Sequence, residues 1–244
     1  MEIPARQLPK TINPCPIRES LVELRFEPKV PLEVFLGLLY EKLKDEFTNP
    51  PQKTNILDIP SIIRDSDKNL KYAPHYQFEN NDFLLKTSPR SISIAYKGEY
   101  PGWEKFFGFV KKVLIVSKEI DFMDKVSRIG VRYISFFEKL NIFSETKVEI
   151  KLFGNILTEE KNILRSEFNL DDFICVLLLS NTASFNQNGT TKQGSSIDID
   201  IIKEENSLNE HSFEDIIDKA HEKGKIIFFG LLKEKFLNTL HPEY

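Results

Sequence analysis

Three arginines are the clearest candidates for chemistry, because they recur at alternate positions of two apolar segments. Arg25 lies in residues 21–27, and Arg128 and Arg132 lie in residues 128–136. Residues two or four apart in a strand point to the same face of a sheet. A guanidinium group can form paired hydrogen bonds with a carboxylate or a phosphate. The pattern predicts either a charge ladder with nearby glutamates or a binding face for an anion or an acidic partner.

A second pattern, Glu149-Ile150-Lys151, is similar to the carboxylate-x-lysine strand of metal-dependent nucleases. Such enzymes need another acidic side chain nearby to complete an oxygen-ligand site for a hard metal ion. Glu138 is the nearest upstream candidate, and nothing in the sequence fixes its position. Alternating charge on a half-buried strand produces the same pattern without catalysis. A metal-dependent nuclease or phosphoesterase using Glu149 and Lys151 is therefore the alternative function.

Other catalytic patterns are missing from the sequence. The four histidines lack the spacing of helical metal ligands, and no cysteine pair accompanies them. There is no Gly-x-Ser-x-Gly or Gly-x-Gly-x-x-Gly motif. Residues 189–196 have two glycines at phosphate-loop spacing, but Ser195 replaces the required lysine. We expect no metal and no cofactor, and the sequence favours a protein without enzymatic activity while leaving that activity open.

The composition is that of an ordinary globular protein, with 244 residues, 41% apolar, 29% charged and a net charge of -4. Nucleic-acid-binding domains are usually basic, so nucleic acid is left open as a partner but not favoured. No apolar run approaches the roughly 20 residues of a membrane span, and the first residues have no apolar signal core. The two cysteines lie far apart, as in proteins of a reducing compartment. We therefore expect a cytoplasmic protein that does not enter a membrane.

The arginines are positioned by an ordered series of elements in the first half of the chain. Alternating apolar residues indicate strands, and apolar residues spaced three and four apart indicate helices. The order strand, helix, strand, strand, helix, strand is typical of a ferredoxin-like split unit, whose first and last strands are antiparallel neighbours. We expect Trp103, at the start of the second helix, to be buried against the sheet. The predicted elements are strands at 21–27, 76–79, 83–86, 91–96 and 128–136, and helices at 32–47 and 103–117.

The second half repeats this theme less clearly. A Glu- and Lys-rich segment suggests a short helix, and a polar, Gly-containing segment suggests a loop. Ser212 is placed to cap a long C-terminal helix. The predicted elements are strands at 148–152, 172–180 and 196–203, a helix at 158–167, a loop at 181–195 and a helix at 212–240.

Together these elements predict an α+β fold. The first half forms the ferredoxin-like unit, and the second half adds further antiparallel strands and the long C-terminal helix. We expect a single domain over residues 1–244 with two coupled halves, at about 17–140 and 145–244. Four prolines make residues 1–16 an extended arm.

The C-terminal helix has two apolar lines, although a helix that covers one sheet needs only one. The second line passes through Phe229, Leu232 and Phe236. These side chains would form a sizeable exposed patch on a soluble monomer. We therefore expect a homodimer contact, or a contact with a partner protein, through these three residues.

Three separated motifs carry a family resemblance. Residues 21–28 read LVELRFEP, residues 100–106 read YPGWEKF and residues 128–134 read RIGVRYI. In this order they resemble an uncharacterised, sporadically distributed family of bacterial and archaeal proteins of about this length, with Val131 where leucine is expected. The family has no established activity to carry over. Its sporadic distribution implies horizontal exchange, and hence a role in phage defence, a toxin–antitoxin pair or another mobile module.

The motifs and the lack of a catalytic constellation favour one function over the others. We expect a cytoplasmic binding or partner module, with its ligand unknown. The arginine face is the first place to look for that ligand.

Overall fold

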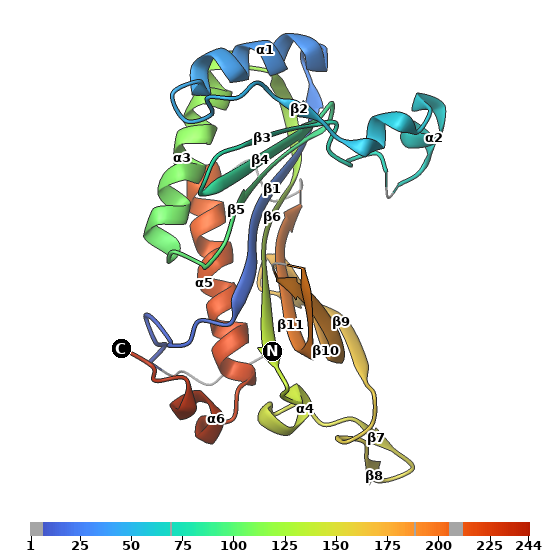
Figure 1. Ribbon diagram of the computed structural model, residues 1–244, viewed down its shortest axis with the longest axis vertical. Coiled ribbons are helices and arrows are strands. Elements are labelled where there is room, and N and C mark those ends of the chain that lie inside the picture. The colour runs from blue at the N-terminus through green and yellow to red at the C-terminus, as the bar shows by residue number, and fades with distance from the viewer. Residues whose placement is uncertain (1–6, 69, 188, 205–211) are drawn as a thin grey trace. The chain divides into compact units, whose positions relative to one another are not determined.

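The computed structural model describes residues 7–68, 70–187, 189–204 and 212–244 (Figure 1). The chain divides into two units. Unit 1 comprises Met1–Ser20, Val131–Ile202 and Asp218–Tyr244, and unit 2 comprises Leu21–Gly130 and Lys203–Ile217. Helices and antiparallel strands occur in both, so the α+β class expected from the sequence is confirmed.

In unit 2 the strands follow the order β2-β3-β4-β5-β1-β6. Helices α1 and α3 cover one face of this sheet (Figure 1). The strands and helices predicted for the first half of the chain are all present, with differences at their ends, and β2, η1 and α2 are additional to them. The elements are β1 (Ile17–Pro28), α1 (Leu32–Leu43), β2 (Gln52–Lys53), the 3₁₀ helix η1 (Asn55–Asp58), α2 (Ser61–Ser66), β3 (Tyr76–Glu79), β4 (Phe83–Ser88), β5 (Ser91–Tyr96), α3 (Trp103–Ile120) and β6 (Met123–Glu138).

Alternation along β1 determines which face of the sheet is apolar. Val22, Leu24 and Phe26 are fully or almost fully buried. Phe26 packs edge-to-face on Phe35 of α1 and on Phe122, with ring centroids 6.3 and 5.2 Å apart. Such aromatic pairs add about 0.5–1.5 kcal/mol to the burial of their area. The intervening residues of β1 must therefore project from the opposite face.

Trp103 does not have the predicted position. The buried stripe of α3 passes through Phe106, Val110 and Val113, and Trp103 is only half-buried. It stacks on Phe107, one turn further along, with ring centroids 4.7 Å apart. Residues four apart in a helix lie one above the other, so Trp103 and Phe107 run together along the margin of the stripe.

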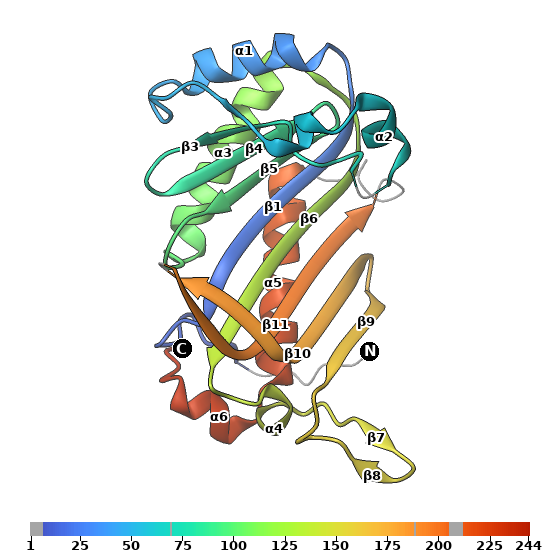
Figure 2. The ribbon, with the colours of Figure 1, turned by 45° about the vertical axis from the view of Figure 1, so that its right-hand side comes forward.

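In unit 1 the strands follow the order β6-β11-β10-β9, and α5 covers one face of them (Figures 1 and 2). Strands β7 and β8 form a separate two-stranded hairpin. Strands β1, β6 and β11 and helix α5 contribute residues to both units. The elements are α4 (Ile142–Glu145), β7 (Lys151–Leu152), β8 (Asn155–Ile156), β9 (Ile163–Leu170), β10 (Phe173–Gln187), β11 (Thr190–Glu204), α5 (Phe213–Leu231) and α6 (Glu234–Thr239).

Three predictions for residues 148–195 are wrong. The segment 158–167 is not a helix, because residues 163–170 pair with β10 as strand β9. The strand expected at 148–152 is reduced to the two residues of β7. The loop expected at 181–195 is strand, because β10 and β11 stay paired as far as Gln187 and Thr190 after a shift in register. Pairing with a neighbouring strand overrides local helix and loop propensity.

The C-terminal helix is also not continuous. It breaks between α5 and α6, where Leu232 forms an isolated bridge with Thr146. Phe229, Leu232 and Phe236 are buried within the one chain, with exposed fractions of 6%, 0% and 6%. They therefore form no exposed patch, and this removes the reason for expecting a contact through them.

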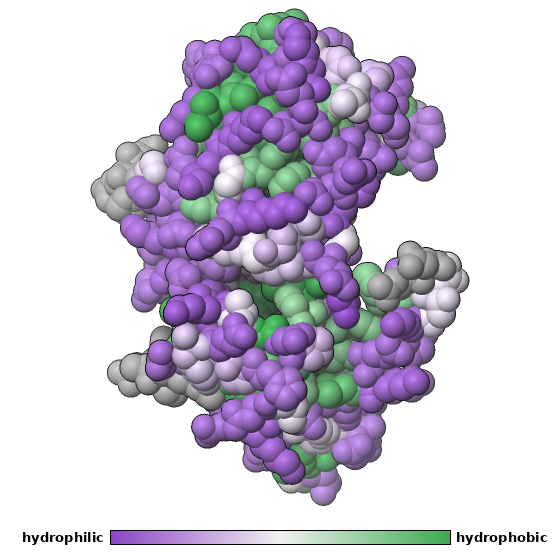
Figure 3. Space-filling model, turned by 60° about the vertical axis from the view of Figure 1, so that its left-hand side comes forward, coloured by the Kyte–Doolittle hydropathy of each residue, from purple (hydrophilic) through white to green (hydrophobic). Residues whose placement is uncertain are grey.

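The predicted division into halves at about 17–140 and 145–244 stays a prediction, since four elements pass from one unit to the other. Residues 7–16 of the predicted arm hold one bridge, between Thr11 and Glu243, and residues 1–6 lie outside the described residues. Hydrophilic residues predominate on the face drawn in Figure 3. None of the helices described combines the length and apolar character that crossing a bilayer requires.

Gly194 of β11 marks the closest backbone approach at any described glycine. A β-carbon built on Gly194 would lie 2.1 Å from the carbonyl oxygen of Phe137 in β6. The next residue, Ser195, is buried, and its hydroxyl accepts a hydrogen bond from the backbone N–H of Ile142 at 3.0 Å. The segment with the glycine spacing of a phosphate loop is thus a packing contact between strands.

Because backbone atoms cannot move aside cheaply, we expect Gly194→Ala to lower the free energy of unfolding by about 2–4 kcal/mol. The matched control is Gly108→Ala in α3, where a β-carbon meets nothing within 4 Å. That substitution should raise stability by about 0.5–1 kcal/mol through helix propensity. Urea denaturation of both variants measures the difference, and equal stabilities would contradict the close approach.

Candidate functional site

Two arginines share one carboxylate on the face of unit 2 opposite α1 and α3. Nε of Arg25 and Nη1 of Arg128 each donate a hydrogen bond of 2.7 Å to Oε1 of Glu23. Glu23 and Arg25 come from β1, and Arg128 comes from the neighbouring strand β6. The Glu23 and Arg128 side chains are 18% and 16% exposed, so both ion pairs are partly shielded from solvent.

Gly130 makes room for this arrangement. A β-carbon on Gly130 would lie 2.8 Å from Nη1 of Arg128. The arginine side chain therefore lies back along its own strand, over the glycine, to reach Glu23. A glycine inside a strand often marks such a close approach. Here the approaching group is a side chain rather than another backbone.

Arg25 is held by a second contact. Its guanidinium carbon lies 4.3 Å from the centroid of the Tyr72 ring, and Lys71 Nζ lies 5.4 Å from the same centroid. The Tyr72 carbonyl in turn accepts a hydrogen bond of 2.9 Å from the Ser91 hydroxyl on β5. A guanidinium fixed by a carboxylate and an aromatic ring has lost most of its rotamer freedom before any ligand arrives.

The outer edge of the Arg25 guanidinium group, formed by Nη1 and Nη2, remains available to a ligand. Across the described ranges, its Nη1 and Nη2 donate to no protein group, and the side chain is 31% exposed. The cluster brings the guanidinium groups of Arg25 and Arg128 to the one Glu23 carboxylate. The Nη1 and Nη2 atoms of Arg25 add two parallel N–H donors, the arrangement that binds a carboxylate or phosphate through two hydrogen bonds.

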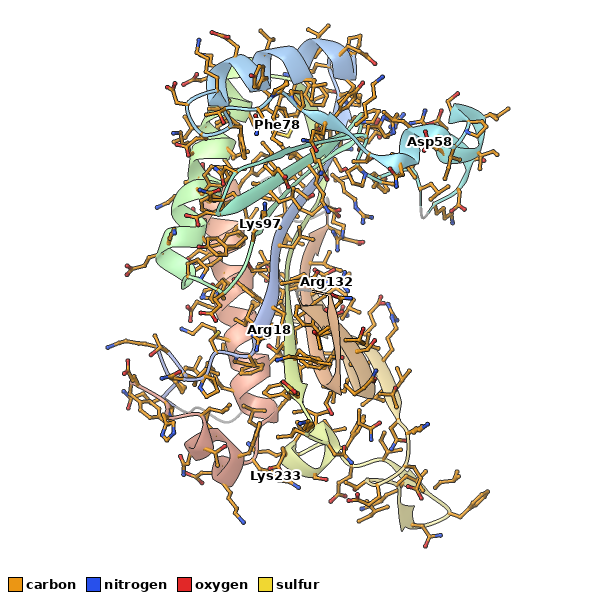
Figure 4. All side chains as sticks on the ribbon, viewed as in Figure 1. Arg18, Asp58, Phe78, Lys97, Arg132 and Lys233 are labelled. Atoms are coloured by element: carbon orange, nitrogen blue, oxygen red, sulfur yellow. The ribbon has the colours of Figure 1, made fainter. Side chains whose placement is uncertain are left out.

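Arg132 does not join this cluster. It belongs to unit 1 and is labelled in Figure 4. Its Nε and Nη2 donate to the two carboxylate oxygens of Asp198 at 2.8 and 2.5 Å. These hydrogen bonds raise the pKa of the Arg132 guanidinium above its ordinary value. The sequence placed three arginines on one binding face. The structure brings Arg25 and Arg128 together at Glu23 and gives Arg132 a partner of its own.

Tyr72 and Lys71 could not be identified from the sequence. They lie in an irregular connection between α2 and β3, where no periodicity indicates a direction for any side chain. Tyr72 is identified by its contact with Arg25, and Lys71 by its contact with the Tyr72 ring.

Glu149 and Lys151, the residues of the alternative nuclease hypothesis, lie in a more exposed environment than the arginine cluster. Lys151 and Glu149 bind each other at 2.7 Å, with side chains 55% and 59% exposed. Glu138, the third residue considered, pairs instead with Lys192 at 2.9 Å. Within the described residues, no group of three or more His, Cys, Asp or Glu side chains could hold a metal ion. The geometry therefore adds nothing to the nuclease hypothesis.

The chain matches no model of a known protein family and no curated protein. The resemblance to a sporadically distributed family accordingly stays an expectation drawn from three motifs. The structure adds one observation about these motifs. The first supplies Glu23 and Arg25, and the third supplies Arg128 and Gly130, so two of them meet in a single cluster.

A buried histidine lies elsewhere, in unit 1. Nδ1 of His221 is 2.9 Å from the Tyr133 hydroxyl, and only 7% of the residue is exposed. Burial, with a smaller contribution from Lys225, lowers the pKa of the His221 imidazole from 6.5 to about 3. The ring is therefore neutral near pH 7, and its Nδ1 can accept a hydrogen bond from the Tyr133 hydroxyl.

The lowered pKa makes stability depend on pH. The unfolded chain binds a proton at His221 below about pH 6.5, whereas the folded chain resists protonation until about pH 3. We expect His221 to destabilise the fold progressively as the pH falls through this window, by up to roughly 3–5 kcal/mol. Comparing urea denaturation of wild type and His221→Gln from pH 7 to pH 4 isolates this contribution. His241→Asn, at an exposed position, is the control, and a His221→Gln protein with unchanged pH dependence would contradict the assignment.

Proposed function

We propose that the protein is a binding module that recognises an acidic group of a partner protein through Arg25. One observation carries the proposal: Glu23 and Tyr72 fix the Arg25 guanidinium while its outer edge donates to no described protein group. Holding a long side chain in one geometry costs rotamer entropy, and a ligand gains from having that cost met in advance.

The charge balance supports an acidic ligand. Glu23 accepts hydrogen bonds from both Arg25 and Arg128. A carboxylate bound at the Nη1 and Nη2 atoms of Arg25 would give that guanidinium group a second anionic partner. Charge-assisted, two-pronged hydrogen bonds of this kind are roughly twice as strong as neutral ones.

The proposal also includes the cellular location of the protein and the arrangement of strands and helices in unit 2. We propose a cytoplasmic location because the two cysteines lie far apart, as in proteins of a reducing compartment. A phage-defence or toxin–antitoxin system would supply a partner from a neighbouring gene, and this part rests on the resemblance alone. The strand order β4-β5-β1-β6, with helices following β1 and β5, supports a ferredoxin-like arrangement in unit 2.

The test uses a hexaglutamate peptide as the probe, titrated into the purified protein by calorimetry at low ionic strength. Arg25→Gln should weaken binding by roughly tenfold or more, because it removes both donors and the charge. Arg165→Gln is the matched control. Arg165 is also an exposed, ion-paired strand residue, but it lies in unit 1 and binds Glu167 at 2.9 Å. Its loss should leave the affinity unchanged.

Arg25→Lys separates geometry from charge. Lysine keeps the charge but cannot present two parallel donors, so a two-pronged contact predicts intermediate affinity. Equal binding by wild type and Arg25→Gln would overturn the proposal. If Arg25→Gln and Arg165→Gln lowered the affinity for the peptide equally, the binding would be general electrostatic attraction and not recognition at a site. Inorganic phosphate in place of the peptide tests whether the edge prefers carboxylates.

A further inference from the structure

Strand β9 leaves one edge of the unit 1 sheet open. Among the described strands it pairs with β10 alone, so it ends the order β6-β11-β10-β9 (Figure 2). Edge strands are commonly protected by being short or by a lysine, a proline or a bulge. β9 has eight residues with no lysine or proline, and its pairing with β10 is regular from Ile163 to Leu170. It therefore offers a long, unprotected row of backbone groups to another strand.

The pairing with β10 determines which backbone groups of β9 face the open edge. The Asn162 carbonyl accepts a hydrogen bond of 3.2 Å from the backbone N–H of Asn181, and the Asn162 N–H donates to Oδ1 of Asn181 at 2.8 Å. The backbone groups of Asn162 therefore face β10. Because these groups alternate in direction along a strand, the N–H and C=O groups of residues 163, 165, 167 and 169 face outward.

The side chains of β9 alternate between an exposed charged face and a half-buried apolar face. Arg165 and Glu167 lie on the exposed face, with side chains 59% and 52% exposed, and Nη2 of Arg165 donates to Oε2 of Glu167 at 2.9 Å. Leu164, Ser166 and Phe168 lie on the other face and are half-buried. The apolar face thus continues to the open edge, where Leu164 and Phe168 have further area to bury.

We propose that β9 pairs antiparallel with β9 of a second copy of this chain, about a two-fold axis at Ser166. In a two-fold contact, each residue that faces another is faced by it in return. An axis at Ser166 sets Arg165 of each copy opposite Glu167 of the other, and Leu164 opposite Phe168. The outward backbone groups of the two strands then meet, and opposite charges and apolar pairs directly across strands stabilise the pairing.

The order of charges along β9 favours a second copy over a strand of another protein. An unrelated strand would gain the backbone hydrogen bonds whatever its side chains, whereas β9 is complementary in charge to itself when its direction is reversed. The same charges select the register. Moving the axis by one residue to Arg165 sets two arginines against each other, and moving it to Glu167 sets two glutamates against each other. Like charges directly opposite destabilise a pair of strands.

The test measures the mass of the purified full chain by sedimentation velocity over a dilution series at low ionic strength. Wild type should approach twice the 28.4 kDa of one chain as the concentration rises. Arg165→Glu and Glu167→Arg each set like charges opposite each other across the axis, so each should weaken dimerisation by roughly tenfold or more. The control is Lys42→Glu. Lys42 lies in α1 of unit 2, is 51% exposed and pairs with Glu119, so the same change of charge there should leave dimerisation unchanged.

The two β9 variants are complementary to each other, and this gives a rescue experiment. In an equimolar mixture, two acidic side chains of the Arg165→Glu chain face two basic side chains of the Glu167→Arg chain. The mixture should therefore form a heterodimer at concentrations where each variant alone has the mass of one chain. The double variant Arg165→Glu/Glu167→Arg exchanges the two charges and should dimerise as wild type does. Rescue requires both chains to be folded, so misfolding of a variant cannot imitate this result.

Three results would overturn the inference. A wild type that keeps the mass of one chain throughout the series would show that β9 does not pair with a second copy. A dimer that survives both single substitutions would lie on another surface. Single variants that lose the dimer without regaining it in the mixture would contradict the register. The inference is independent of the Arg25 proposal, because the Arg25 cluster lies in unit 2 and β9 lies in unit 1, so either test can fail alone.

Discussion

The site in unit 2 depends on one constraint, which is that a strand can bury only alternate residues on one face. β1 directs Val22, Leu24 and Phe26 towards α1 and α3, and its pairing with β5 sets Leu24 opposite Ile92. A slip of one residue would exchange the two faces and bury charge in the aromatic core. The position of Glu23 and Arg25 on the opposite face is thus a consequence of the core, and the binding proposal depends on the same register.

On that face, the pairing of opposite charges lowers the free-energy cost of partly burying Glu23, Arg25 and Arg128. An unpaired, partly buried guanidinium group would be costly, and Glu23 meets this need for Arg25 and Arg128 together. All three side chains remain partly exposed, so solvent also screens their charges. Gly130 permits the sharing, since any side chain there would push Arg128 away from Glu23.

The elements could be predicted from the sequence where the apolar periodicity and the positions of proline and glycine indicated the same boundaries. In the first half, alternating strands and striped helices are bounded by proline and glycine, and the predicted elements are present. It failed at β9, where a Glu- and Lys-rich lead-in suggested a helix although Leu164, Phe168 and Leu170 alternate along the segment. It also failed at the β10–β11 hairpin, where the polar content of 181–195 outweighed the turn signal Asn188-Gly189. In both places, pairing with a neighbouring strand decided the structure, and a local pattern cannot show its partner.

The residues of the candidate site also divide into those that the sequence predicted and those that it missed. Alternation predicted that Arg25 and Arg128 would share a face, but it could not predict that Arg132 would have Asp198 as its own partner. It also missed Tyr72, which reaches Arg25 from an irregular connection. Natural sequences tend to agree with their structures at every level, and disagreement concentrates at functional sites. The Nη1 and Nη2 atoms of Arg25, which donate to no protein group among the described residues, are an arrangement of this kind. The binding proposal rests on that arrangement, because the core explains where Arg25 lies but not what its outer donors contact.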